Sequence, residues 1–83
     1  MNNKILVTIY VFSIDESYDL LIPVNLKMSE TLDLIQDTLV ELSNNNYVKH
    51  ENVILINSES KIINNKNVVR LSGLTNGCKI MLV

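Results

Sequence analysis

The sequence predicts an α+β fold in which a mixed β-sheet carries one helix on one face, with the elements in the order ββαβββ. Short runs rich in Ile, Val, Leu and aromatic residues, which favour strands, recur near both ends of the chain. Between them, residues 29–42 instead space their apolar residues at helical intervals. A chain of 83 residues has room for one hydrophobic core, so we expect a single domain over residues 1–83.

The first two strands are expected to form a β-hairpin. Residues 4–13 are rich in Ile, Val, Tyr and Phe, and a polar turn at 14–17 precedes a second apolar run at 18–24. Pro23 has no backbone N–H to donate, so it should lie near the end of the second strand or on a sheet edge.

A single amphipathic helix is expected after this hairpin. Ser29 or Thr31 is a suitable N-cap, because its hydroxyl can accept a hydrogen bond from an unpaired amide of the first turn. The asparagines at 44–46 suit the left-handed conformations that end a helix. The apolar residues recur at steps of three and four and therefore share one face; they are Leu32, Ile35, Leu39 and Leu42.

Three further strands should complete the sheet. They are residues 53–56, a short strand at 61–63, and residues 78–83, which follow an Asn-Gly pair suited to positive φ. The first and last strands are free to pair in parallel at the centre of the sheet. Alternation along the strands and spacing on the helix predict the core, which comprises Ile5, Val7, Ile9, Val11, Leu20, Ile22, Leu32, Ile35, Leu39, Leu42, Val53, Leu55, Ile80 and Leu82.

The strands are apolar on both of their alternating sides, which a sheet with one solvated face does not require. If one set packs under the helix, the other forms an exposed apolar patch, and such patches usually mark a protein interface. We therefore expect this face to bind a protein partner or to form a homodimer, unless terminal segments of the same chain cover it. The residues expected there are Leu6, Tyr10, Phe12, Leu21, Ile54, Met81 and Val83.

Charge is distributed unevenly along the chain. Residues 1–45 hold seven acids and two lysines, a net charge of −5, whereas the remainder holds five basic residues and two acids, a net charge of +3. The basic residues are spread out and lack clustered arginines or stacking aromatics, so we expect no nucleic-acid partner. On the helix, Asp33, Asp37 and Glu41 form an acidic stripe, which is either an ordinary solvated face or a docking surface for a basic partner.

The residue types that carry chemistry are sparse. His50 is the only histidine, whereas a zinc site needs about three or four ligands, so we expect an exposed loop histidine and no metal. Cys78 is the only cysteine and is expected to be a small core hydrophobe. The two glycines match neither a phosphate-binding loop nor a dinucleotide fingerprint. We therefore expect no cofactor and no enzymatic activity.

Cysteine content and hydropathy also bear on location. A lone cysteine cannot form an internal disulfide, so a reducing cytoplasm is the expected compartment. The longest apolar run is far shorter than the ~18–20 residues that span a bilayer, so we expect no insertion into the membrane.

Several segments together resemble a known family. They are the opening strand, Tyr-Asp-Leu-Leu-Ile-Pro at 18–23, the Leu/Ile helix, and Leu-Ser-Gly-Leu-Thr-Asn-Gly at 71–77 before a short last strand. In this order they resemble the ubiquitin-like β-grasp, and more closely the YukD/EsaB-like proteins of bacterial type VII secretion systems. The resemblance implies an accessory or regulatory protein that binds a secretion component, in the cytoplasm or peripheral to the machinery at the membrane.

One feature departs from ubiquitin. Conjugation requires a flexible C-terminal Gly-Gly, whereas this sequence ends in Met81-Leu82-Val83 and reads as strand. We therefore expect a non-conjugated module. Two alternatives stay open: a carrier acting in covalent transfer, and a small enzyme or redox switch that uses Cys78.

Overall fold

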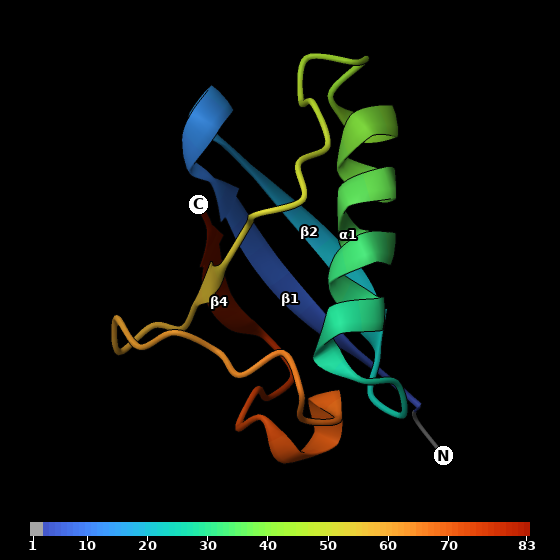
Figure 1. Ribbon diagram of the computed structural model, residues 1–83, viewed down its shortest axis with the longest axis vertical. Coiled ribbons are helices and arrows are strands. Elements are labelled where there is room, and N and C mark those ends of the chain that lie inside the picture. The colour runs from blue at the N-terminus through green and yellow to red at the C-terminus, as the bar shows by residue number, and fades with distance from the viewer. Residues whose placement is uncertain (1–2) are drawn as a thin grey trace.

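The computed structural model describes residues 3–83 and shows a four-stranded sheet with one long helix across one face (Figure 1). The strands lie in the order β2-β1-β4-β3, with β1 and β4 parallel at the centre and antiparallel pairs on either side. The expected α+β architecture is therefore confirmed. The elements are β1 Lys4–Val11, the 3-10 helix η1 Phe12–Ile14, β2 Glu16–Pro23, α1 Met28–Leu42, β3 Leu55–Ile56, the 3-10 helix η2 Val69–Leu71 and β4 Cys78–Leu82.

The expected hairpin of β1 and β2 is present, but its turn comes earlier than predicted: the 3-10 helix η1 follows Val11, and β2 already begins at Glu16. Asp15 follows that turn with φ 51°, a left-handed conformation that Asp tolerates better than most residues. β2 is an edge strand, and Pro23 is its last residue. The missing N–H of Pro23 therefore leaves no gap in the ladder.

The N-terminus of α1 differs from the sequence prediction. The helix begins at Met28 with Lys27 as its N-cap, and no side chain caps it, so the assignment of Ser29 or Thr31 as N-cap is wrong. Instead, the amides of Met28 and Ser29 donate to the backbone carbonyls of Asn67 and Asn65, at 2.8 and 3.0 Å. A distant loop satisfies the first-turn amides, which removes the need for a local cap.

The C-terminus of α1 is confirmed. Asn44 and Asn45 adopt positive φ values of 53° and 66°, and the Asn45 amide donates to the Val40 carbonyl at 2.9 Å. Asparagine tolerates this left-handed region, so the run of asparagines turns the chain away from the helix axis.

The strand expected at 61–63 is wrong, because this segment contributes only an isolated bridge between Ile62 and Ile56. The side chain of Asn57 explains the difference: its Oδ1 accepts hydrogen bonds from the amides of Glu59 and Lys61, at 2.9 and 3.0 Å. These bonds close a tight turn, beyond which only two backbone hydrogen bonds join the segments: the Asn57 amide donates to the Lys61 carbonyl at 2.9 Å, and the Ile63 amide to the Leu55 carbonyl at 2.8 Å. The strand expected at 53–56 is correspondingly reduced to Leu55–Ile56.

The parallel pairing of β1 with β4 is anchored at Leu6. The Leu6 amide donates to Asn76 Oδ1 at 2.8 Å, and the Leu6 carbonyl accepts from the Gly77 amide at 2.6 Å. Gly77 has φ 86°, the positive value expected for the Asn-Gly pair. This turn therefore fixes the register in which Val7 lies beside Cys78.

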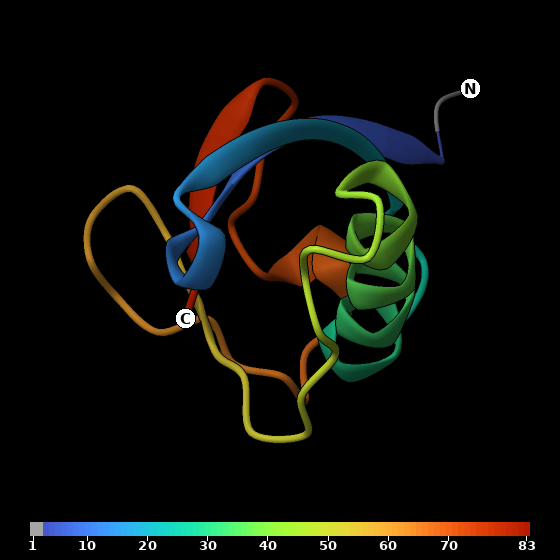
Figure 2. The same cartoon turned by 90° about the horizontal axis from the view of Figure 1, so that it is seen from above.

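The core lies between α1 and the sheet, and the segment that carries η2 closes it from below (Figure 2). Twelve of the predicted core residues are buried there, and Ile5 packs against them half-buried. Leu42 is the exception: its side chain is 49% exposed, so its assignment to the core is wrong. The loops supply further buried residues that periodicity did not indicate, namely Val24, Tyr47 and Ile63, while η2 adds Val69 and α1 adds Met28.

Within residues 3–83, no helix combines the length and the apolar character that a bilayer crossing requires.

Candidate functional site

The sheet face turned away from α1 carries the side chains that alternation along the strands assigned to it. Leu6, Phe12, Leu21, Ile54 and Val83 are exposed, and Phe12 and Leu21 are the most exposed of these at 64%. Tyr10 and Met81 are half-buried. The structure therefore places all seven predicted residues at the surface, while their role in binding stays a prediction.

The strand register arranges this face in cross-strand rows. Leu6 lies beside Leu21, and Tyr10 lies beside Met81. Between these rows, Thr8 is flanked by Asp19 on β2 and Lys79 on β4. The Thr8 hydroxyl donates to Asp19 Oδ1 at 2.7 Å. The expectation of one contiguous apolar patch is therefore wrong, because a polar row divides the face in two.

The larger apolar part lies where β1 and β4 end and β3 begins, and we call it the end patch: Tyr10, Phe12, Ile54, Met81 and Val83. Ile54 and Val83 exchange two backbone hydrogen bonds, both of 3.0 Å, which extend the β3–β4 ladder by one pair. Ile56 lies beside Met81 on the same side. The end patch therefore rests on paired backbone, which holds its side chains in fixed positions.

Within the end patch, a hydrogen bond holds the hydroxyl of Tyr10. Its hydroxyl donates to Asp15 Oδ1 at 2.5 Å, and this hydrogen bond raises the pKa of Tyr10 above its ordinary value of 10.0. The bond fixes the ring against the turn that follows β1. Its apolar face is thereby left for contact with Met81 and with any partner.

The acidic stripe on α1 is partly neutralised. Lys49, in the loop after the helix, forms ion pairs with Asp33 at 2.7 Å and with Asp37 at 2.8 Å. The hydrogen bonds to Asp33 and Asp37 raise the pKa of Lys49. Because the ion pairs are exposed, they contribute little stability. Glu41 forms no ion pair within residues 3–83 and stands apart from the other two acids.

His50 and Cys78 lie where the sequence suggested, one in a loop and one in a strand. His50 is exposed, and its ring meets the Tyr47 ring edge-on with the ring centroids 6.2 Å apart. Cys78 is half-buried and packs against the core. Among residues 3–83, no three His, Cys, Asp or Glu side chains are grouped closely enough to hold a metal ion.

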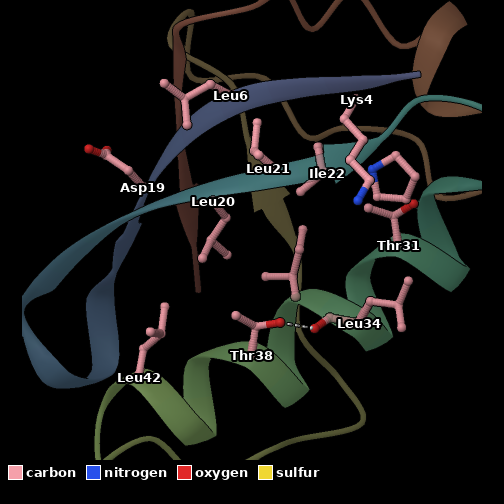
Figure 3. A pocket seen from close by; sticks show the side chains of 12 residues that line it. Lys4, Leu6, Asp19, Leu20, Leu21, Ile22, Thr31, Leu34, Thr38 and Leu42 are labelled. Atoms are coloured by element: carbon pink, nitrogen blue, oxygen red, sulfur yellow. Dashed lines mark hydrogen bonds between the residues drawn. The ribbon is translucent and has the colours of Figure 1, made fainter. Parts of the chain in front are cut away.

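A second surface feature was not anticipated from the sequence. An open groove of about 710 Å³ runs between β2 and α1, and Figure 3 shows Leu20 pointing from the strand toward the helix across it. Leu21 on the strand, and Leu34 and Leu42 on the helix, line its rims. We call it the β2–α1 groove. The sequence signal that could have indicated it was Leu34, an apolar helix residue outside the predicted core face.

No protein-family model matches the chain, and no curated protein matches it in sequence. Solved structures do match its fold. The ubiquitin-like domain of the type VII secretion system protein EccD1 of Mycobacterium tuberculosis superposes with a TM-score of 0.76 at 17% identity, covering 100% of this chain and 99% of that one.

Two further solved structures are similar over almost their whole length. A structure described as molecular mimicry of SUMO that promotes DNA repair has a TM-score of 0.75 at 22% identity and covers 100% of this chain and 94% of that one. The EccD5 ubiquitin-like domain from Mycobacterium xenopi has a TM-score of 0.74 at 12% identity and covers 99% and 94%. At these identities the likeness establishes the fold, and this chain therefore has the ubiquitin-like β-grasp fold.

Proposed function

We propose that the chain is a non-conjugated ubiquitin-like module that binds another protein and serves as an accessory or regulatory component of a type VII secretion system. Two observations support the assignment to secretion. The sequence segments described above resemble the YukD/EsaB-like proteins, and the fold is similar to the ubiquitin-like domain of the secretion protein EccD1. The module acts by binding, without a cofactor, in the cytoplasm or at the cytoplasmic side of the secretion machinery.

The observation that carries a binding role is the end patch. Phe12, Ile54 and Val83 are 64%, 37% and 39% exposed and lie beside Tyr10 and Met81. Aromatic residues and Met are enriched at protein interfaces. Burying a cluster of exposed apolar side chains against a partner removes apolar surface from water, which favours association. The partner we propose is a component of the secretion machinery, with a second copy of this chain as the other candidate.

A pair of matched substitutions tests this proposal. Ile54→Glu places a charge in the end patch, whereas Leu71→Glu places the same charge at a more exposed position, 74%, on η2 and outside the patch. With tagged protein in cells that encode it, Ile54→Glu should abolish co-purification with secretion components and reduce secretion, while Leu71→Glu should preserve both. Equal effects of the two variants contradict the assignment of the end patch.

A second pair separates binding from folding. Met81→Asp alters a half-buried residue on the outer face and should leave the melting temperature nearly unchanged while abolishing the interaction. Its neighbour Ile80 is 4% exposed, so Ile80→Asp buries a charge and should unfold the domain. If Met81→Asp unfolds the protein or leaves every interaction intact, this surface is not the binding site.

Absence of conjugation is tested directly. Mass spectrometry of the protein recovered from its own cells should show no isopeptide adduct between this chain and a lysine of another protein. An adduct at Val83 would instead support the carrier function.

A further inference from the structure

Asn76 and Gly77, the two residues immediately before β4, form a chemically reactive pair. In an unfolded chain, the backbone nitrogen of the residue after an asparagine can attack the side-chain amide carbon, Cγ. A following glycine makes this attack easiest, because no side chain obstructs the approach. Asn76 is the only asparagine of the sequence that a glycine follows. It is therefore the asparagine that should deamidate most readily when the chain is unfolded.

The reaction proceeds through a cyclic imide. The deprotonated Gly77 nitrogen forms a bond to Asn76 Cγ, the Cγ–Nδ2 bond breaks, and Nδ2 takes up the proton that Gly77 gave up and leaves as ammonia. Water then opens the ring. Addition of water at Cγ gives aspartate in an ordinary peptide chain, whereas addition at the backbone carbonyl carbon of Asn76 gives isoaspartate, in which the chain runs through Cβ and Cγ. Water is the only co-reactant.

In the folded protein, the backbone of Leu6 holds both reacting groups. Its amide donates to Asn76 Oδ1 at 2.8 Å, which fixes the side-chain amide against β1. Its carbonyl accepts from the Gly77 amide at 2.6 Å. The Gly77 nitrogen must lose its proton before it can attack, and an N–H that is hydrogen-bonded in a sheet is withheld from base, which is also why its hydrogen exchange is slow. The two contacts therefore block the first step while β1 and β4 are paired.

Burial does not provide this protection. Asn76 and Gly77 are both exposed, and a Cβ added at Gly77 would meet nothing within 4 Å, so water and base can reach this turn. The hydrogen bonds to Leu6 are consequently what distinguishes the folded chain from the unfolded chain at this position.

The two products affect the strand pairing differently. Aspartate keeps a carboxylate oxygen in the place of Oδ1, and a carboxylate is a stronger acceptor for the Leu6 amide. Isoaspartate instead adds one atom to the backbone between Cα of residue 76 and the Gly77 nitrogen. The Gly77 amide can then no longer meet the Leu6 carbonyl while Val7 lies beside Cys78. Isoaspartate is therefore incompatible with the observed register of β1 and β4.

We propose that Asn76 is a deamidation site that the pairing of β1 with β4 keeps closed. It reacts when Leu6 releases it, and isoaspartate at this position then prevents β4 from pairing again in register. A chain modified in this way loses the arrangement that sets Met81 beside Tyr10. The modification site depends neither on a role in secretion nor on what the end patch binds.

A comparison of the folded protein with a peptide tests the protection. Trypsin cleaves after Arg70 and Lys79 and releases residues 71–79, in which Asn76 is the only asparagine. The protein and a synthetic peptide of residues 71–79 are incubated in the same mildly alkaline buffer with a reducing agent, and mass spectrometry of this fragment follows deamidation. The folded protein should deamidate at least about a hundredfold more slowly than the peptide, because central strands open rarely. In urea, the two rates should agree.

Hydrogen exchange of the Gly77 amide gives an independent measure of the same opening. Exchange of this amide and attack on Asn76 Cγ both require the deprotonated Gly77 nitrogen. Folding should therefore slow deamidation and Gly77 exchange by the same factor, each measured relative to the peptide.

A matched pair of variants tests the role of Asn76 Oδ1. Asn76→Asp keeps an acceptor for the Leu6 amide and should melt like the parent protein. Asn76→Leu has a similar shape but no acceptor, so it should melt at a lower temperature and exchange its Gly77 amide faster. The isoaspartate form, separated by chromatography after deamidation in urea and returned to buffer, should melt lower than Asn76→Asp and show no protection of Gly77.

Three results would overturn the proposal. The first is deamidation of Asn76 in the folded protein as fast as in the peptide. The second is a Gly77 amide whose exchange is slowed far more than deamidation, which would show that the reaction proceeds without release from Leu6. The third is an isoaspartate form that melts like the parent protein. Each measurement uses the protein without secretion components, so its failure is distinct from failure of the proposed function.

Discussion

The side-chain amide of Gln36 pairs with the backbone of His50 through two hydrogen bonds. Gln36 Nε2 donates to the His50 carbonyl at 2.9 Å, and Gln36 Oε1 accepts from the His50 amide at 2.8 Å. The same Oε1 also accepts from the Tyr47 hydroxyl at 2.6 Å, with both side chains buried. One helix residue thereby ties the loop after α1 to the helix itself.

Removing the Gln36 side-chain amide should destabilise the protein. Gln36→Leu leaves the buried Tyr47 hydroxyl and the His50 backbone groups without partners, which should lower the free energy of unfolding by about 2–4 kcal/mol. Tyr47→Phe removes one donor and leaves Gln36 still paired with His50, so it should cost only about 1 kcal/mol. Urea denaturation of the two variants checks this difference, and an equal or reversed order would contradict the network.

The unfolding free energy should depend on Tyr47 at alkaline pH. Burial raises the pKa of Tyr47 above its ordinary value of 10.0, and the nearby charge of Lys49 lowers it by less. As the pH rises above 10, the unfolded chain therefore loses this proton first, and stability that is complete below pH 10 declines. The decline should be less steep in Tyr47→Phe. The remaining slope includes Lys49, whose raised pKa acts in the same direction.

Replacing Thr31 with Val should not destabilise the protein. The Thr31 side chain is fully buried under the β2–α1 groove, and within residues 3–83 its Oγ1 has no hydrogen-bond partner. Thr31→Val keeps the shape and removes the desolvated hydroxyl, so the melting temperature should stay equal or rise. Thr31→Ala is the control, because it leaves a cavity and should lower the melting temperature. A large loss with Val would show that the hydroxyl is bonded in solution.

Two leucines near the end of α1 should respond differently to truncation. Leu39 is fully buried, so Leu39→Ala should cost about 2–5 kcal/mol of the ~5–15 kcal/mol that stabilises a small domain. Leu42 is 49% exposed, and Leu42→Ala should change stability by no more than about 0.5 kcal/mol. Thermal and urea denaturation measure both. Equal costs would place Leu42 in the core after all.

Local chemistry allowed the sequence to predict much of the fold. Apolar alternation predicted which side of β1 packs under the helix, because successive strand residues point to opposite faces. The asparagines after α1 predicted its end, since few other residues adopt positive φ at low cost. Exposure of Leu6, Phe12 and Leu21 on the outer face follows from the same alternation.

Predictions from sequence spacing were wrong where a segment distant in the chain made the contact that a neighbouring residue was expected to make. It placed Leu42 in the core, but Tyr47 returns to α1 and is buried there, while Leu42 lines the groove instead. Local capping rules chose Ser29 or Thr31 for the helix start, but the carbonyls of Asn65 and Asn67 satisfy the first-turn amides from a loop far along the chain.

The two candidate surfaces depend on tertiary structure in the same way. Alternation assigned Leu6 and Met81 to one face, but only the pairing of Thr8 with Asp19 and Lys79 shows that a polar row lies between them. The β2–α1 groove exists because α1 packs beside an edge strand, a relationship that no sequence spacing encodes. Sequence patterns determined which way the strand side chains point. Strand register and helix placement decided which side chains became neighbours, because those contacts join residues far apart in the chain.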